Sequence, residues 1–398
     1  MKNVILLFLL IIGCGITQAQ LPNINPKKVG LDKNKLTSVD NVILESIQKG
    51  EIPGAVLAVV RHKKIAYLKA YGNKQVYPDT IAMTTNTVFD LASLSKSVST
   101  AISTMILLER GQIRLRDNVS IYIPDFQPWI DPESGKKKNI RIIDLLTHTS
   151  GLPSYASVEA LKKEYTMPNP DGLITYISKV KRNNEPSTVF DYSCLNFITL
   201  QRIIETVSGM SLQDFAKQNI FGPLAMLHTD YNPTGETLSW VAPTQKQADG
   251  SVLKGKVHDP LAGIVNGGVS GNAGIFSNAQ DLSILSAMLL NNGEIKGVRI
   301  LSPLTVKVMR SVPRGFEKFG RALGWDVYSG YASDGDLFDV SAYGHTGYTG
   351  TSITLDPESD TAVILLTNRV HPEDKGAVSR LREVVANVVA ASIVDMNF

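Results

Sequence analysis

Three short segments of the chain carry residue types that suit acyl transfer through a serine. The first is Ser93-Leu94-Ser95-Lys96. A serine hydroxyl is a poor nucleophile until a nearby base takes its proton. Positions i and i+3 of a helix share a face, so Lys96 can approach Ser93 Oγ. A lysine buried among apolar neighbours can lose its own proton near neutral pH and act as that base.

The Ser-x-x-Lys pattern by itself is not specific, because the chain contains it three times. It occurs at Ser46 to Lys49, at Ser93 to Lys96 and at Ser134 to Lys137. The first lies at the polar end of an amphipathic helix and the last in a lysine-rich loop. Ser93 alone opens a long apolar helix directly after an apolar run, and this context selects it as the nucleophile.

The second and third segments could supply the partners of the serine. In Tyr192-Ser193-Cys194, the phenol of Tyr192 beside a lysine ammonium can be held as phenolate and act as the base. The third segment, His345-Thr346-Gly347 followed by Tyr348, has glycines on both sides. They suit a strand edge that a substrate backbone approaches closely.

The elements that must position these residues follow from apolar periodicity and turn signals. Helices are expected over 36–48, 93–110, 142–148, 196–207, 212–220, 281–290 and 377–394, and hairpins over 55–60 with 64–71 and over 351–355 with 361–366. Strands therefore lie towards both ends of the chain and helices between them. We predict an α+β fold, with one antiparallel sheet flanked by helices and a mainly helical insertion domain.

This pattern divides the chain into two structural domains. Residues 28–92 and 301–398 are expected to form a discontinuous α/β domain, and residues 93–300 a mainly helical one. Clefts usually form where such units meet. We therefore expect the active site at the seam between them.

Composition excludes several other classes of protein. The 398 residues are 43% hydrophobic and 19% charged, an ordinary globular composition, and the net charge of +3 argues against nucleic-acid binding. The chain has no His-Glu-x-x-His, and two cysteines cannot build a structural zinc site, so neither metal nor cofactor is expected. The segment Gly268-Val269-Ser270-Gly271 is no nucleophile elbow, because Asn272 stands where the last glycine should be.

The first 19 residues are expected to be a signal peptide. Lys2 precedes an apolar run over 4–12 that is too short to span a bilayer. Two modes of processing stay open. One is cleavage after Ala19; the other is lipidation of Cys14 in a lipobox-like Ile-Ile-Gly-Cys, which would attach the protein to a membrane. Either route places the protein in the cell envelope, outside the cytoplasm, and leaves no cysteine pair for a disulfide.

The three segments, in this order, resemble the active-site motifs of the serine β-lactamase and penicillin-binding-protein superfamily. Their positions are similar to those of its class C-like branch. The segments 145–153, 257–259, 267–274 and 367–372 also match, and the last three look most like a subgroup of low-molecular-weight penicillin-binding proteins and muropeptide amidases. The resemblance covers about residues 28–395 and implies a β-lactamase/transpeptidase-like fold.

The resemblance also implies roles for named residues. Ser93 would form the acyl-enzyme, Lys96 and Tyr192 would share the proton transfers, and the backbone N–H groups of Ser93 and Tyr348 would form the oxyanion hole. His345, Thr346 and Gly347 would line the substrate site. Of the other positions in the matching segments, His258 is expected at the cleft rim with Asp259, and Arg369 and His371 are candidates for a substrate carboxylate. His148 is interpreted as structural.

Two positions depart from the family pattern. Cys194 stands where Asn or Asp is usual, and a thiol is a weak hydrogen-bond partner for lysine or a substrate amide. His345 replaces the usual lysine, a change that recurs in esterase-like and amidase-like relatives. Because histidine titrates near neutrality, its charge is conditional, and we expect poor β-lactam turnover.

The sequence thus predicts a secreted serine hydrolase that acts through an acyl-enzyme on amide or ester bonds. The expected substrates are small molecules or cell-wall-derived peptides, as for a D-Ala carboxypeptidase or a muropeptide amidase. Two alternatives stay open: an esterase of the same family, or a low-turnover penicillin-binding or sensing protein.

Overall fold

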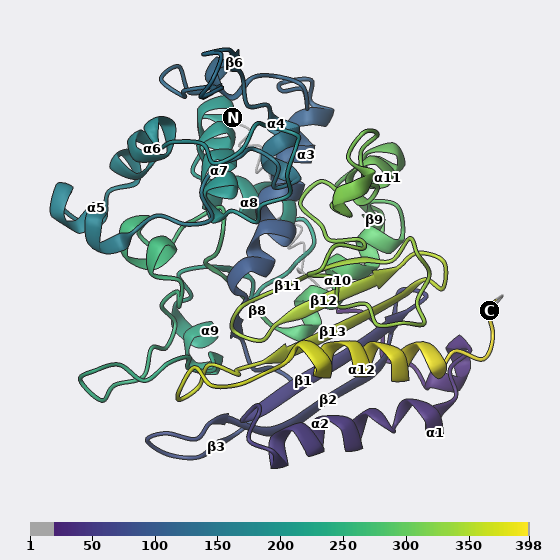
Figure 1. Ribbon diagram of the computed structural model, residues 1–398. Coiled ribbons are helices and arrows are strands. Elements are labelled where there is room, and N and C mark those ends of the chain that lie inside the picture. Colours follow the sequence, from purple (N-terminus) through teal and green to yellow (C-terminus); the bar gives the residue numbers. More distant parts are fainter. Residues whose placement is uncertain (1–19, 397–398) are drawn as a thin grey trace, which may run out of the picture.

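A single antiparallel sheet forms the base of the molecule in the computed structural model, which describes residues 20–396 (Figure 1). Its six strands lie in the order β11-β12-β13-β1-β2-β3. Their bounds are β1 (Gly54–Arg61), β2 (Lys64–Gln75), β3 (Ile81–Ala82), β11 (Tyr343–Thr346), β12 (Ser352–Asp356) and β13 (Thr361–Thr367). The central pair β1 and β13 joins the two ends of the chain, with Ala58 opposite Ile364.

The two faces of the sheet are covered by different helices. Alternate residues of a strand point to opposite faces, and both faces of β1 are buried. Ala55, Leu57 and Val59 pack in one cluster with α2 (Val39–Gln48) and α12 (Ser379–Ala391). Val56, Ala58 and Val60 belong to the large core on the other side. Figure 1 shows α2 and α12 lying together along the first face.

The opposite face of the sheet packs against α10 (Ala279–Leu290), which contacts β1, β12 and β13. This helix falls within residues 93–300, the range that the sequence assigns to the helical domain, and it packs directly on the sheet. Residues 282–289 are all buried. A helix that is apolar on nearly every side must be covered on every side, and the sheet supplies part of that cover. The division into two domains stays a prediction.

The helical part lies above the sheet in Figure 1. Its helices are α3 (Ile102–Glu109), α4 (Ile142–Leu146), α5 (Val158–Glu164), α6 (Pro170–Lys179), α7 (Cys194–Ser208), α8 (Leu212–Ala216) and α9 (Gly235–Trp240). This part also contains three short helical turns, η4 (Val119–Ile121), η5 (Lys217–Phe221) and η6 (Leu261–Val265). Two small sheets complete it. One has the strand order β4 (Phe89–Asp90), β8 (Ile275–Ser277), β7 (Asp230–Tyr231), and the other pairs β5 (Trp129–Ile130) with β6 (Lys137–Lys138).

The remaining elements flank the sheet or precede it. They are η1 (Pro26–Val29), α1 (Lys33–Leu36), the hairpin of β9 (Glu294–Ile295) and β10 (Val298–Arg299), α11 (Pro303–Arg310) and η7 (Glu317–Phe319). Over residues 20–396, no helix combines the length and the apolar character that crossing a membrane requires. The expected signal peptide lies outside these residues.

The helix expected over 93–110 is divided into three pieces. A 3₁₀ turn, η2 (Ala92–Leu94), leads into a π-helical stretch, η3 (Lys96–Ala101), and then into α3. Every residue of η3 is buried. π-helical turns are rare and frequently lie at functional sites.

Gly324 lets the loop before β11 press against this buried helix. Its φ is +82°, and a Cβ added there would lie 2.5 Å from the Cβ of Ala101. Its N–H donates to Leu146 O (3.0 Å), and its carbonyl accepts a hydrogen bond from Ser97 Oγ (2.7 Å). The glycine therefore holds the helix, α4 and the loop at one point.

We predict that Gly324→Ala lowers the free energy of unfolding by about 2–5 kcal/mol, because the left-handed backbone and the overpacking both oppose a methyl group. Gly111→Ala is the matched control: φ is +67°, yet nothing lies within 4 Å of the added Cβ. The control should lose only about 1–2 kcal/mol. Urea unfolding of both variants measures the difference, and equal losses would contradict the argument.

Candidate active site

Ser93 follows a tight, buried turn at the end of β4. Ala92 has a φ of +45°, unusual for a residue with a side chain, and its N–H donates to Asp90 Oδ1 (2.8 Å). The other oxygen of Asp90 accepts the N–H of His258 (2.7 Å). Burial raises the pKa of Asp90 to about 6 despite these two hydrogen bonds. The carboxyl group thus joins the turn before the nucleophile to the loop at the cleft rim.

Lys96 is fully buried, and three acceptors surround its Nζ. They are Ser93 Oγ (2.9 Å), the carbonyl of Asn272 (2.9 Å) and Cys194 Sγ (3.6 Å). An ammonium has three N–H donors, so this set matches the charged form. Burial acts to lower the pKa of Lys96, but the neighbouring Cys194 and Tyr192 side chains outweigh it and the pKa is raised. Of the two proton acceptors left open by the sequence, the geometry therefore favours Tyr192, held beside a lysine ammonium.

Tyr192 is held by stacking on both of its faces. Its ring lies 4.3 Å from that of His148 and 5.3 Å from that of Tyr331, and Lys96 Nζ lies 5.1 Å from its centre. His148 Nδ1 accepts the N–H of Ser193 (3.1 Å). Burial and the nearby cations hold the pKa of His148 well below 6.5, so the ring stays neutral and can accept. His148 thus has a structural role in which it orients the tyrosine segment.

Cys194 begins α7 and its sulfur contacts the lysine. Burial raises the pKa of this thiol above its usual range, in spite of the nearby Lys96. At neutral pH the group is therefore a neutral thiol and only a weak acceptor. The strong acceptor on this side is the carbonyl of Asn272, whose own side-chain Oδ1 accepts from Ser270 Oγ (2.6 Å).

The third segment lies at the end of β11, beside the turn that carries Ser93. Thr349 Oγ1 donates to Asp90 O (2.6 Å) and Thr351 Oγ1 to Leu91 O (3.0 Å). Gly347 is required at this crossing, because an added Cβ would lie 2.2 Å from Leu91 O. Two chain segments far apart in sequence are thus fixed against each other next to the nucleophile.

This crossing leaves two backbone N–H groups unused beside the cleft. Within residues 20–396, neither the N–H of Ser93 nor that of Tyr348 donates a hydrogen bond. Ser93 and Tyr348 line the same two pockets. An oxyanion hole needs two such donors, prepared in advance for the charge that develops on the carbonyl oxygen. The arrangement is compatible with the roles that the family resemblance implies.

His345 is buried behind this edge and uncharged. Its Nδ1 lies 2.8 Å from the carbonyl of Thr346, which can only accept, so Nδ1 carries the proton. Burial holds the pKa of His345 well below 6.5, helped by the cations Arg321 and Lys96. The sequence suggested a charge that varies near neutrality; in the folded protein the ring is neutral there.

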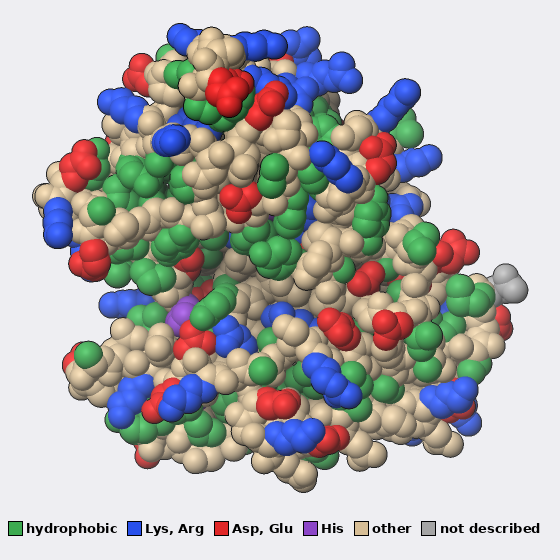
Figure 2. Space-filling model, in the orientation of Figure 1, with side chains coloured by type: hydrophobic (Ala, Val, Ile, Leu, Met, Phe, Trp, Pro, Cys, Tyr) green, Lys and Arg blue, Asp and Glu red, His purple; other side chains and the backbone are tan. Residues whose placement is uncertain are grey.

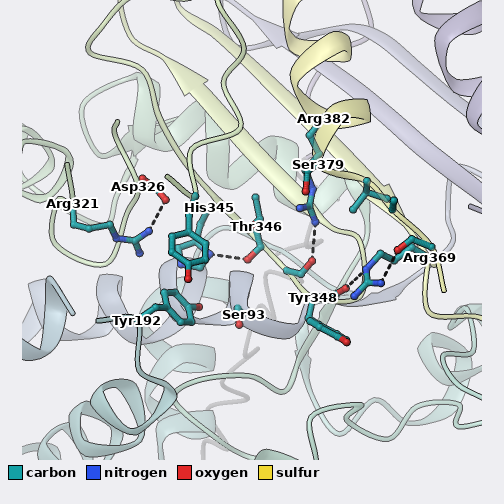
Figure 3. Close-up of a pocket in the computed structure, with 15 residues that line it drawn as sticks. Ser93, Tyr192, Arg321, Asp326, His345, Thr346, Tyr348, Arg369, Ser379 and Arg382 are labelled. Atoms are coloured by element: carbon teal, nitrogen blue, oxygen red, sulfur yellow. Dashed lines mark hydrogen bonds and ion pairs between the residues drawn. The ribbon is translucent and has the colours of Figure 1, made fainter. Parts of the chain in front are cut away.

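A pocket of about 440 Å³ opens on one side of Ser93, and Figure 3 shows the residues that line it. It contains five of the predicted site residues besides Ser93 and Tyr348. These are Tyr192, His345, Thr346, Gly347 and Arg369. A second pocket, of about 680 Å³, opens on the other side and is lined by His258. Figure 2 shows the surface hollowed between the helical part and the sheet.

Two arginines of the first pocket were missed from the sequence. Arg321 is buried and paired with Asp326 (2.7 Å), but its Nε and Nη2 have no partner among the described residues. Arg382, on α12, donates from Nη2 to Gly347 O (2.8 Å) and Thr351 O (3.0 Å). No carboxylate of residues 20–396 lies within ion-pair distance of it. Neither belongs to a motif, so spacing gave no signal for them.

Arg369 and His371, the expected carboxylate contacts, are occupied within the protein. Arg369 Nη1 pairs with Asp374 (2.8 Å), and its Nε donates to Tyr348 O (2.6 Å). Arg369 lines the first pocket but chiefly holds the turn that presents Tyr348. His371 accepts the N–H of Val76 (3.0 Å) and contacts Thr244 O (2.8 Å). The role predicted for His371 is wrong, because both of its ring nitrogens are used in packing.

Comparison with known proteins identifies the class. The family model described as Beta-lactamase matches residues 39–387, and the chain belongs to this family of serine hydrolases. It is 30% identical over 93% of its length to a protein named "Putative D-alanyl-D-alanine carboxypeptidase" of Escherichia coli K12, covering 91% of that protein. It is 34% identical to an N-acetylmuramyl-L-alanine amidase of Bacillus subtilis 168, covering 87% of the chain and 84% of the relative.

Solved structures agree on the fold. EstCE1, described as a hydrolase with promiscuous acyltransferase activity, superposes with a TM-score of 0.73 at 23% identity, covering 90% of this chain and 99% of EstCE1. A class C beta-lactamase superposes with a TM-score of 0.69 at 19% identity, covering 90% and 96%. The predicted β-lactamase/transpeptidase-like α+β fold and the class C-like resemblance are confirmed.

We predict that the His345 imidazole stays neutral at pH 6.5. Because its folded pKa lies below the unfolded value of 6.5, its contribution to stability is present above pH 6.5 and is lost as the pH falls through the folded pKa. Arg321→Met should move the pKa upward by removing a neighbouring cation, whereas Lys318→Met, at an exposed position, should not. NMR titration of the imidazole measures both shifts. A wild-type midpoint at or above 6.5 would contradict the argument.

Proposed function

We propose that this family hydrolase cleaves amide or ester bonds of cell-wall-derived peptides through an acyl-enzyme on Ser93. The observation that carries the proposal is the contact of Lys96 Nζ with Ser93 Oγ at 2.9 Å, beside two unused backbone N–H groups. A prepared nucleophile and a prepared oxyanion site serve acyl transfer together.

In the first half of the reaction, Ser93 Oγ attacks the substrate carbonyl carbon and its proton passes to the Tyr192 oxygen, which enters the step as a phenolate beside the Lys96 ammonium. The N–H groups of Ser93 and Tyr348 receive the charge on the carbonyl oxygen, and Lys96 remains an ammonium. The C–N or C–O bond then breaks, and the leaving group takes the electron pair and the proton from Tyr192. Water repeats the sequence on the Ser93 ester, releases the acid and restores the serine proton.

The names of the relatives and the charge of the first pocket support a cell-wall substrate. A D-alanyl-D-alanine carboxypeptidase and an N-acetylmuramyl-L-alanine amidase both take their names from cell-wall peptide bonds. Arg321, Arg369 and Arg382 line the pocket that also contains Tyr192. A peptide carboxylate suits such a pocket, since hydrogen bonds between charged groups are the stronger ones.

Two features support esterase activity as a second candidate function. His345 is neutral and so places no requirement for an anion at the strand edge. EstCE1, whose fold is similar, is described as a hydrolase with acyltransferase activity. Cys194, as a weak partner for Lys96, favours the further alternative of a penicillin-binding or sensing protein that labels readily and turns over slowly.

We predict that Ser93→Ala abolishes labelling by a fluorophosphonate and abolishes release of D-alanine or of the peptide from a muropeptide digest, followed by mass spectrometry. Ser46→Ala is the control, since Ser46 Oγ bonds Glu51 (2.7 Å) and Lys49 pairs with Glu45 (2.5 Å) instead of the serine. Tyr192→Phe should slow turnover by about a hundredfold or more. Labelling that survives in Ser93→Ala would overturn the proposal; labelling without turnover would favour the sensing protein.

We also propose that the protein acts in the cell envelope, attached to the membrane through a lipid on Cys14 or released after Ala19. The support is the charged start and the apolar run of residues 1–19. Cys14 and Ala19 lie outside the residues that the structure describes.

Fractionation of cells that express the full chain is expected to place the protein in the envelope and not in the cytosol. The variant Cys14→Ala then distinguishes the two modes of processing. Loss of membrane association indicates lipidation, and unchanged fractionation indicates cleavage after Ala19. Wild-type protein found in the cytosolic fraction would contradict the proposed location.

A further inference from the structure

The two pockets beside Ser93 differ in charge and in polarity. Three arginines line the first, whereas the second is lined by no lysine or arginine of residues 20–396. The second pocket has an apolar wall and acidic side chains at its edge. Its apolar wall consists chiefly of Tyr155, Val158, Pro260, Ile264 and Ala273. A substrate held with its carbonyl at Ser93 must extend into both pockets, one half in each.

The position of Tyr192 decides which half of the substrate enters which pocket. Tyr192 returns the proton to the leaving group, and it lines the first pocket but not the second. The leaving group therefore occupies the pocket with the arginines. The acyl half, which stays bonded to Ser93, then occupies the second pocket of about 680 Å³.

Asp259 is the acidic side chain of this acyl pocket that has no cationic partner among the described residues. Its Oδ1 accepts the Tyr155 hydroxyl (3.0 Å) and the N–H of Ala262 (2.8 Å). Over residues 20–396 no lysine, arginine or histidine comes within ion-pair distance of it, although the longer-range field of Lys96 reaches it. The neighbouring His258 is kept uncharged, because burial lowers its pKa.

The other two acids of the pocket are already paired. Asp374 binds Arg369 (2.8 Å) and accepts the Tyr348 hydroxyl (2.5 Å). Glu159 is exposed and binds Lys162 (2.9 Å). Of the three acids, Asp259 is therefore the one without an ion-pair partner among residues 20–396. It lies beside an apolar wall, in a pocket that Ser93 also lines.

We propose that the second pocket binds an acyl group with an apolar stem that carries a cation, and that Asp259 pairs with this cation. The inference rests on the proposed function, since it assigns the acyl half of the same Ser93 acyl-enzyme. Charge complementarity sets the specificity, and the apolar wall receives the stem. A free amine on a peptide side chain has this chemistry.

Two esters of equal shape test the charge requirement. p-Nitrophenyl 6-(trimethylammonio)hexanoate carries a permanent cation, and p-nitrophenyl 7,7-dimethyloctanoate replaces it by an uncharged tert-butyl group. Wild-type kcat/KM should favour the cationic ester by about fivefold, the effect of one partly exposed ion pair. In Asp259→Asn, which keeps the size and the acceptor oxygen, the ratio should fall to about one.

Two further variants separate charge from shape. Asp259→Glu should retain a preference for the cationic ester. Glu164→Gln removes an equal charge from an exposed position of α5 outside the pocket, and it should leave the ratio at the wild-type value.

The outcomes distinguish the two proposals. A wild-type ratio below about two, or a preference that persists in Asp259→Asn, overturns the acyl pocket while Ser93-dependent turnover keeps the proposed function. Turnover of both esters that is unchanged in Ser93→Ala overturns the proposed function itself.

Discussion

The burial of one positive charge, that of Lys96, constrains the whole active site. An ammonium that is removed from water is costly unless its donors are paired. The acceptors come from three separate segments: the nucleophile turn, the loop at Asn272 and the start of α7 at Cys194. Each must arrive at the lysine in the folded state. The catalytic residues are therefore gathered by the same contacts that make the buried charge tolerable.

The sheet edge adds a second fixed point to this arrangement. Thr349 and Thr351 bond the two carbonyls that precede Ala92, and Arg369 bonds the carbonyl of Tyr348. The two threonine bonds join chain segments about 260 residues apart, so the edge and the nucleophile turn cannot shift independently. The left-handed conformation of Ala92 is retained because both sides of the turn are held.

The sequence predicted those parts whose signal is local. The Ser93 motif, the sheet hairpins and the final helix follow from spacing and periodicity. Gly347 was expected to let a substrate backbone approach, whereas the backbone that approaches it is that of Leu91. The sequence did not predict the arginines of the first pocket, because Arg321 and Arg382 owe their position to tertiary packing. Asp259 was expected at the cleft rim, but its lack of a cationic partner among the described residues also depends on tertiary packing. The sequence did not reveal that α10 packs on the sheet, since a helix that is apolar on most sides does not show which layer covers it. Nor did it reveal that both ring nitrogens of His371 are used in packing, since a histidine in a family-like segment does not show its hydrogen bonds.

The two departures from the family pattern both lower the polarity of the reacting centre. A neutral thiol at Cys194 and a neutral imidazole at His345 each stand where a stronger polar or charged group is usual. Cys194 contacts Lys96, whose ammonium also donates to Ser93 Oγ and Asn272 O. His345 makes no such contact, but the charge of Lys96 acts on its pKa. Because the reacting centre carries less charge, recognition of charged substrate groups depends on the side chains that line the two pockets beside Ser93. Those side chains have opposite charges on the two sides of Ser93, so they fix the direction in which a substrate can lie, and hence which of its bonds reaches the serine.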